Sequence, residues 1–153
     1  MPPPLLRLAD QAAYQQHFVT KYCAGPLITN DGIPVFFKRH SFYHAFFDTV
    51  VHKDDTFSSI RAERMDWIEA TLVDPQTQRF QGYLAKVKKH DPARRVELRY
   101  QNFIVVLIMG LKKDGSLKAE FLTCYAVNNN RLPKVQNAPA WTREDCENAL
   151  QKR

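Results

Sequence analysis

Two histidines stand four residues apart, directly after a basic pair, in the order Lys38, Arg39, His40 and His44. If this segment is helical, His40 and His44 share one face of the helix. Because imidazole titrates near neutral pH, one histidine can act as general base and the other as general acid. RNA cleavage needs a base for the 2′-hydroxyl proton, an acid for the leaving oxygen, and cations for the phosphorane. The segment therefore predicts phosphodiester chemistry, with Lys38 and Arg39 binding the substrate.

Two alternatives remain open for these histidines. In the first, one is solvated and the other packs beneath aromatic residues. In the second, the H-x-x-x-H spacing holds zinc, but Ser41 stands where metalloproteases carry glutamate, and no third ligand is evident. The three cysteines are widely spaced and form no C-x-x-C pair, which argues against a disulfide framework or a cysteine-built zinc site. We predict no metal and no cofactor.

Two arginines, Arg61 and Arg64, fall beside the apolar stripe of a predicted helix. A guanidinium in that position can clamp a phosphate through two parallel hydrogen bonds. The alternative is that Arg64 forms an ion pair with Glu63, Asp66 or a residue on the sheet.

Basic residues are dense between positions 86 and 99, next to Tyr83 and Tyr100. Cations beside aromatic rings suit single-stranded RNA, because phosphates bind the cations and bases stack on the rings. The net charge of +6 and the pI near 9.3 also favour a polyanionic partner. The alternative is a solvated edge that discourages sheet aggregation. The predicted RNA-binding residues of this stretch are Lys86, Lys88, Arg95, Arg99 and Tyr100.

A long hairpin from Phe103 to Val127 is the strongest structural signal. Residues 103–109 are continuously apolar and rich in β-branched side chains, which predicts a strand buried on both faces. Asp114-Gly115 indicates a tight turn. Strict alternation along the return strand puts Thr123 and Tyr125 on the face that Leu117 and Phe121 occupy earlier, and their hydroxyls could hold a scissile phosphate. The alternative is that both are ordinary strand residues.

The remaining elements follow from periodicity. We expect helices over residues 9–22 and 40–51 and a third from Ser58 or Ser59 to the residue before Asp74, with Ile60 pointing inward. Strands are expected over 80–87 and 95–100, and a short C-terminal helix after Trp141, capped by Thr142. The prediction is an α+β domain over residues 1–153, with N-terminal helices on a four-stranded antiparallel sheet. Residues 1–8 are expected to form a loose arm and residues 128–140 a loop.

The longest apolar run is far short of the roughly 20 residues that a membrane helix needs. Met-Pro-Pro-Pro at the start lacks the features of a secretory signal. We therefore expect no membrane partner and a cytoplasmic location.

Taken together, these motifs resemble the phage and polymorphic-toxin branch of the barnase–EndoU–colicin–RelE (BECR) nuclease superfold. The resemblance spans roughly Cys23 to Val127. The matching pieces are residues 23–26, 37–40 with 44–46, 61–64 with 66–68, 72 with 74–75, 102–108 and 121–125.

The resemblance implies a metal-independent endoribonuclease that uses the 2′-hydroxyl as nucleophile and leaves a 2′,3′-cyclic phosphate. It implies a toxin or phage-related effector that acts on cellular RNA, including tRNA, with an immunity or antitoxin protein as partner. The matching catalytic positions are His40, His44, Arg64, Thr123 and Tyr125. No acidic residue stands out as a barnase-like base. The alternative is a non-catalytic module that binds RNA or a protein on the same scaffold.

Overall fold

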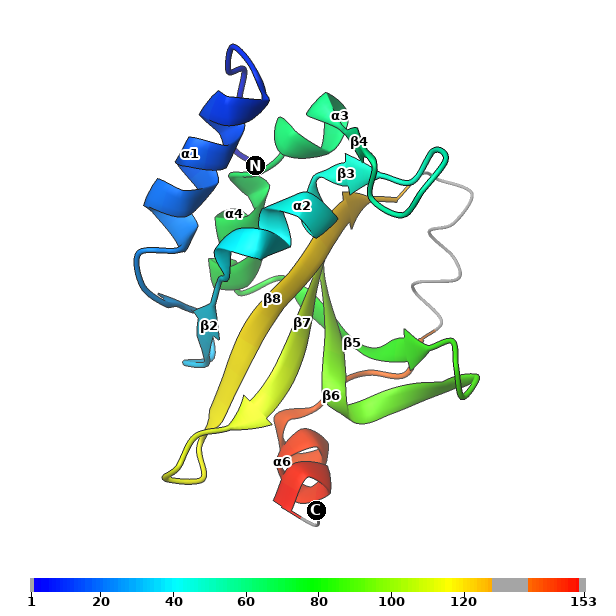
Figure 1. The fold of residues 1–153 in the computed structure, drawn as a ribbon. Helices are drawn as coiled ribbons and strands as arrows, with labels where there is room; N and C mark the ends of the chain where they lie inside the picture. Colours follow the sequence, from blue (N-terminus) through cyan, green and yellow to red (C-terminus); the bar gives the residue numbers. More distant parts are fainter. Residues whose placement is uncertain (1, 128–137, 152–153) are drawn as a thin grey trace.

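The computed structural model describes residues 2–127 and 138–151. It is an α+β fold with a six-stranded sheet in the order β1-β2-β8-β7-β6-β5, a separate β3–β4 pair, and helices (Figure 1). The strands are β1 (Leu27–Ile28), β2 (Pro34–Phe36), β3 (Phe47–Asp48), β4 (Thr56–Phe57), β5 (Gln78–Leu84), β6 (Lys89–Tyr100), β7 (Phe103–Leu111) and β8 (Leu117–Ala126). The helices are α1 (Gln11–Tyr22), the 3-10 turn η1 (Arg39–Ser41), α2 (Phe42–Ala45), α3 (Ser59–Ala62), α4 (Trp67–Val73) and α6 (Arg143–Gln151).

The prediction of a four-stranded sheet was wrong in strand number. β5 to β8 do form an antiparallel meander, but β2 adds to the free edge of β8 in parallel, and β1 pairs with β2. The added strand aligns Val35 with Ala119 and Phe36 with Glu120. Pairing with β2 satisfies backbone groups that an exposed β8 edge would leave open.

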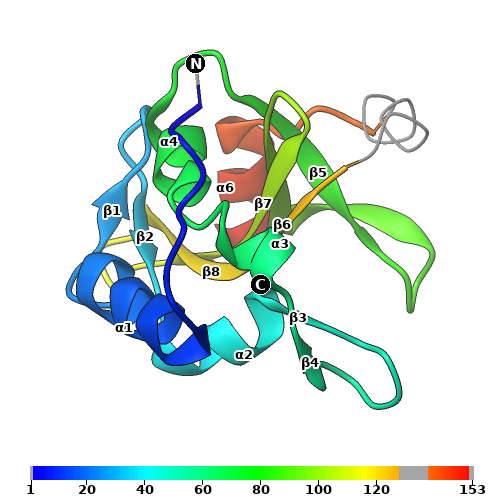
Figure 2. The same cartoon turned by 90° about the horizontal axis from the view of Figure 1, so that it is seen from above.

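One face of the sheet carries the main core. Buried side chains from α1, α2, α4 and α6 join those of β6, β7 and β8 on this face, which we call the core face. Ile104, Val106 and Val127 form a second, smaller cluster on the opposite face, which we call the outer face. Seen from above, the β3–β4 and β5–β6 hairpins project on the side away from α1 and α4 (Figure 2).

A β-bulge in β8 decides which side chains reach the outer face. Leu107 pairs with Phe121, but Val106 pairs with Thr123, so the register shifts at Leu122. The shift reverses the alternation, because an extra residue in one strand turns the following side chains over. Thr123 and Tyr125 therefore lie on the outer face, opposite to Phe121, and the prediction that all three share a face was wrong.

The predicted helix over residues 40–51 forms only in its first half, as η1 and α2, and the prediction was wrong for residues 46–51. Helix α2 ends at Ala45, and the chain turns into β3. Val50 and Val51 are 69% and 77% exposed, so the second half of the expected apolar stripe is not buried. The loop that replaces it is stabilised by the Asp55 carboxylate, which accepts hydrogen bonds from the backbone N–H groups of Val50, Val51 and His52.

The predicted third helix is interrupted between α3 and α4. Ser58 caps α3 as expected, by accepting a hydrogen bond from the Arg61 backbone N–H. Ile60 was expected to point inward but is 67% exposed. At the interruption, the Met65 carbonyl accepts a hydrogen bond from the buried Tyr22 hydroxyl.

Two terminal predictions have clear outcomes. Residues 2–8 form no helix or strand, but they are not loose: the Tyr14 hydroxyl donates to the Leu6 carbonyl, and the Trp67 indole donates to the Pro3 carbonyl. The C-terminal helix α6 is present, with the Thr142 hydroxyl capping Asp145. Most of the predicted 128–140 loop lies outside the described residues.

Candidate functional site

A cleft of about 630 Å³ lies against the outer face of the sheet. It is bounded by β6, β7 and β8 on one side and by η1, α2 and the 49–55 loop on the other. The space between the core face and the helices α1, α4 and α6 is filled with core side chains. The polar residues that line the cleft are His40, Ser41, His44, Lys53, Asp54, Arg95, Glu97, Glu120, Thr123 and Tyr125.

Strand register explains why residues distant in sequence meet here. Glu97 of β6 pairs with Val106 of β7, which pairs with Thr123 of β8. Directly paired residues project to the same face, and neighbouring strands are about 4.8 Å apart, so Glu97 and Thr123 are separated by about 10 Å across the sheet. Tyr125 lies in the next row of the same face, paired with Ile104.

His44 is held by a carboxylate from the neighbouring loop. Its Nδ1 lies 2.9 Å from Asp54 Oδ2, and the two side chains are 40% and 24% exposed. A carboxylate at Nδ1 fixes the orientation of the ring and leaves Nε2 as the nitrogen available to a substrate. His40 is exposed and lines the same cleft one turn earlier. The structure thus brings both predicted histidines to one site, although they do not share a regular α-helix.

Glu97 is the acidic residue that sequence reasoning missed. Its side chain is partly buried, and this burial raises the pKa of the carboxyl, while the nearby Arg95 acts in the opposite direction. A carboxyl with a raised pKa in a cleft is a recognised sign of acid–base function. Its sequence signal is weak but real, because Glu97 is the only acidic residue between Arg94 and Tyr100 in a strand whose alternate side chains are apolar.

Arg95 of β6 lines the cleft and packs against Gly82 of the neighbouring strand β5. A β-bulge separates the pairs Gln81–Val96 and Gly82–Asp91. The aliphatic part of the Arg95 side chain lies so close to Gly82 that a Cβ there would overlap it. The missing side chain of Gly82 therefore makes room for Arg95, which lines the cleft beside Glu97.

The two predicted phosphate-clamp arginines line a smaller cavity of about 220 Å³, which shares Tyr125 with the cleft. Arg61 pairs with Asp48 at 3.2 Å and donates to the Ala45 carbonyl. Arg64 donates to the Ile60 carbonyl at 2.8 Å and to Glu63 at 3.1 Å, so the ion-pair alternative holds for it. Both guanidinium groups therefore already have protein acceptors beside the cleft.

The predicted substrate-binding cations divide among different surfaces. Lys38 pairs with Glu120 at 3.1 Å at the margin of the cleft, and Arg39 is exposed near Cys23. Lys86 and Lys88 are exposed in the β5–β6 turn. Arg99 lies opposite Ile104 in the β6–β7 register, two residue pairs along the same sheet face from Arg95. Its guanidinium donates a hydrogen bond to the Gln101 carbonyl.

Tyr100 does not offer the expected stacking platform, because its side chain is only 8% exposed. The ring of Tyr83 instead lies in edge contact with His90, at 5.3 Å between centroids. The basic stretch therefore contributes mainly Arg95 to the cleft.

Within residues 2–127 and 138–151, no group of three or more His, Cys, Asp and Glu side chains is placed to hold a metal ion. The three cysteines, all in the described part of the chain, are free thiols. Over the same residues, no helix has the length and apolarity required to cross a membrane.

Comparisons of the chain with known proteins identify no relative: no family model, no curated protein and no solved structure matches it.

Proposed function

We propose that the chain is a metal-independent endoribonuclease of the BECR type, which attacks with the 2′-hydroxyl and leaves a 2′,3′-cyclic phosphate. One observation carries the proposal: His44 with its partner Asp54, Glu97, Arg95 and Thr123 line a single cleft, although they come from three separate parts of the chain. Acid, base and cation are the three groups that this reaction requires.

The roles follow from the environment of each group. Glu97, whose raised pKa makes its carboxylate a stronger base, takes the 2′-hydroxyl proton. His44, oriented by Asp54, gives a proton to the leaving 5′-oxygen from Nε2. His40 is the second candidate for this acid role. The hydroxyls of Thr123 and Tyr125 and the guanidinium of Arg95 bind the phosphate and stabilise its developing charge.

The biological role that we propose is that of a toxin or phage-related effector acting on cellular RNA, with an immunity or antitoxin protein as partner. It is supported by the same cleft and by the excess positive charge of the chain. The simplest cellular test is expression of the wild type beside His44→Ala, because only an active ribonuclease should inhibit growth.

The decisive experiment is incubation of purified protein with total RNA and labelled tRNA in excess EDTA. We expect cleavage with cyclic-phosphate ends by the wild type, and a loss of at least about 100-fold in His44→Ala and Glu97→Gln, since a positioned acid or base typically contributes 10²–10⁴-fold. The matched controls are His52→Ala and Glu144→Gln, two exposed residues outside the cleft, which should cleave like the wild type.

Two results would overturn the proposal. Absence of cleavage by folded wild-type protein on every RNA would favour the non-catalytic binding module. Cleavage that survives both cleft substitutions would place the chemistry elsewhere in the chain.

A further inference from the structure

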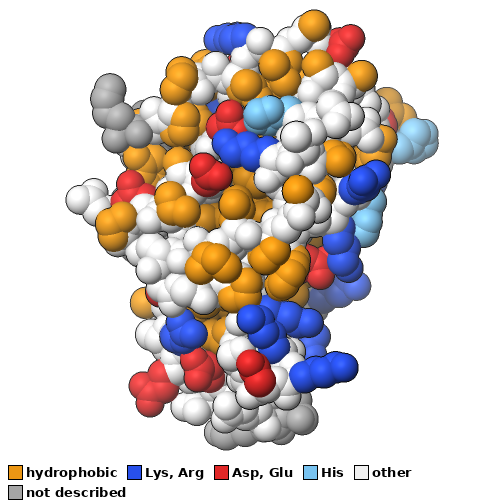
Figure 3. All heavy atoms as spheres, turned by 90° about the vertical axis from the view of Figure 1, so that its left-hand side faces the viewer, with side chains coloured by type: hydrophobic (Ala, Val, Ile, Leu, Met, Phe, Trp, Pro, Cys, Tyr) orange, Lys and Arg blue, Asp and Glu red, His pale blue; other side chains and the backbone are white. Residues whose placement is uncertain are grey.

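A second cavity adjoins the cleft on the outer face. It has a volume of about 450 Å³ and combines an apolar floor with a basic rim. Phe36 and Ile108 belong to the floor, and Lys112, Lys113 and Lys118 belong to the rim. On the side of the molecule that carries β2, hydrophobic side chains gather in the middle, Lys and Arg lie among Asp and Glu below them, and further Lys and Arg follow the right-hand edge (Figure 3).

The two cavities are neighbours, because Glu120 lines both of them. One row of paired residues runs from Arg95 through Ile108 and Glu120 to Phe36, across four strands. Rows on one face are about 7 Å apart and strands about 4.8 Å apart, which puts Phe36 about 8–9 Å from Thr123. A ligand bound at Thr123 can therefore extend over Glu120 to Phe36.

Phe36 is an aromatic side chain without an aromatic partner. It is 42% exposed, and the ring contacts among the described residues do not include it. An exposed ring in a hollow offers a face on which a nucleobase can stack. Its position on β2, the strand added to the meander, explains why the sequence pattern did not indicate it.

The charges around Phe36 fit an anionic ligand. Lys113 and Lys118 are exposed and take part in none of the ion pairs found among the described residues. Glu120 at the junction would repel a phosphate, but Lys38 neutralises it at 3.1 Å.

From these observations we infer that this cavity is a subsite for a further nucleotide of the RNA chain, in which a base stacks on Phe36 and Lys118 binds a phosphate. The inference rests on the proposed function for its choice of ligand. It adds that recognition extends from the cleft toward the β7–β8 turn, along β8, so long RNA is bound more tightly than short RNA.

The test compares the binding of two fluorescein-labelled 2′-O-methyl RNAs of random sequence, one of about 12 nucleotides and one of about three. The 2′-O-methyl group blocks 2′-hydroxyl attack, so binding is measured whether or not the protein is a nuclease. Fluorescence anisotropy is recorded over a range of salt concentrations for the wild type, Phe36→Ala, Lys118→Gln and the control Ile28→Ala, which removes an apolar side chain that is 51% exposed on β1.

We expect Phe36→Ala to weaken binding of the long RNA at least about 5-fold, since stacking on one ring contributes roughly that much or more, and to leave trimer binding unchanged. Lys118→Gln should lower the slope of log K against log salt by about 0.7, the value for one phosphate on a single strand. Ile28→Ala should match the wild type.

Equal binding of the long RNA by Phe36→Ala and the wild type would overturn the subsite, as would failure of the wild type to bind it. These outcomes are separable from the proposed function: RNA cleavage in EDTA with no effect of Phe36→Ala would retain the nuclease and remove the subsite. RNA binding that depends on Phe36, in a protein that does not cleave RNA, would retain the subsite and remove the nuclease.

Discussion

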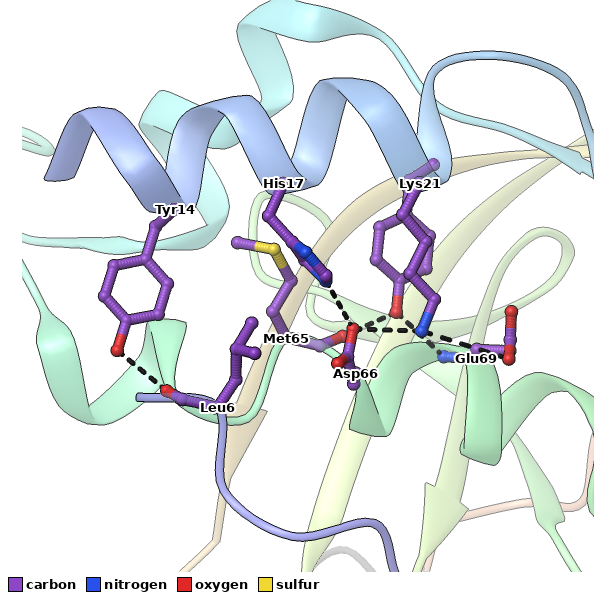
Figure 4. Close-up of polar contacts among 8 residues, drawn as sticks. Leu6, Tyr14, His17, Lys21, Met65, Asp66 and Glu69 are labelled. Atoms are coloured by element: carbon purple, nitrogen blue, oxygen red, sulfur yellow. Dashed lines mark hydrogen bonds and ion pairs between the residues drawn. The ribbon is translucent and has the colours of Figure 1, made fainter. Parts of the chain in front are cut away.

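Asp66 connects α1 to the segment between α3 and α4, and its replacement should destabilise the fold in a pH-dependent manner. Its Oδ1 lies 2.8 Å from His17 Nε2 and 3.0 Å from Lys21 Nζ (Figure 4). Partial burial acts to raise the pKa of Asp66, but the hydrogen bonds from His17 and Lys21 outweigh it and hold the pKa below its usual value. The perturbation is Asp66→Asn, which keeps the shape and removes the charge.

The magnitude follows from these two contacts. A hydrogen bond to a charged group contributes about 1.5–3 kcal/mol. His17 and Lys21 are each 29% exposed and Asp66 is 21% exposed, so solvent screens the pair, and asparagine retains one acceptor oxygen. We therefore expect a loss of about 1–2 kcal/mol, or about 2–8 °C in Tm for a chain of this size.

The pH dependence gives the sharper test. Because the pKa of Asp66 is lowered in the fold, its stabilisation is complete above the unfolded pKa of about 3.9 and is lost as the pH falls through the folded value. Urea denaturation should show a clear difference between wild type and Asp66→Asn at pH 7 that shrinks below about pH 4. The control is Asp10→Asn at the N-cap of α1, which should be nearly neutral because asparagine caps as well as aspartate. An equal difference at pH 7 and pH 3, or an equal loss in the control, would refute the reasoning.

Three further predictions concern the site and the core. Glu97→Gln should stabilise the fold at pH 7 but not below about pH 4. The pKa of this carboxyl is raised in the fold, so its ionisation above the unfolded pKa of about 4.3 lowers the stability of the wild type. Urea denaturation at both pH values checks this. Phe18→Ala should cost about 3–5 kcal/mol in the same assay, since this ring is 0% exposed amid five other aromatic rings. Gly82→Ala should lower the free energy of unfolding by about 1–3 kcal/mol and weaken RNA binding, because its Cβ displaces Arg95; unchanged Tm and binding would contradict this.

Local patterns in the sequence determined the elements whose signal is contained within a few neighbouring residues. The apolar run 103–109 is buried as β7, and Asp114-Gly115 forms the turn, with Gly115 at φ 88°. The spacing of Tyr14, Phe18 and Tyr22 produced α1 at nearly the predicted bounds. In each case periodicity and turn chemistry agree with the tertiary environment.

The tertiary structure decided the features that depend on distant partners. The 40–51 segment has helical spacing, but capture of three backbone N–H groups by Asp55 and pairing of β3 with β4 end the helix at Ala45. The face to which Thr123 and Tyr125 point depends on a register shift against β7, which strict alternation cannot indicate.

The cleft depends both on local sequence and on tertiary structure. The residue types at His40, His44, Thr123 and Tyr125 were readable as candidates for phosphate chemistry, and all four line the cleft. Glu97 carried only a weak signal, because its proximity to them arises from cross-strand register and its raised pKa from burial, and neither is present in the sequence of β6. The sequence by itself determined which chemical groups the chain carries. Only the packing of strands and loops decided which of them face one another, since that depends on residues far apart along the chain.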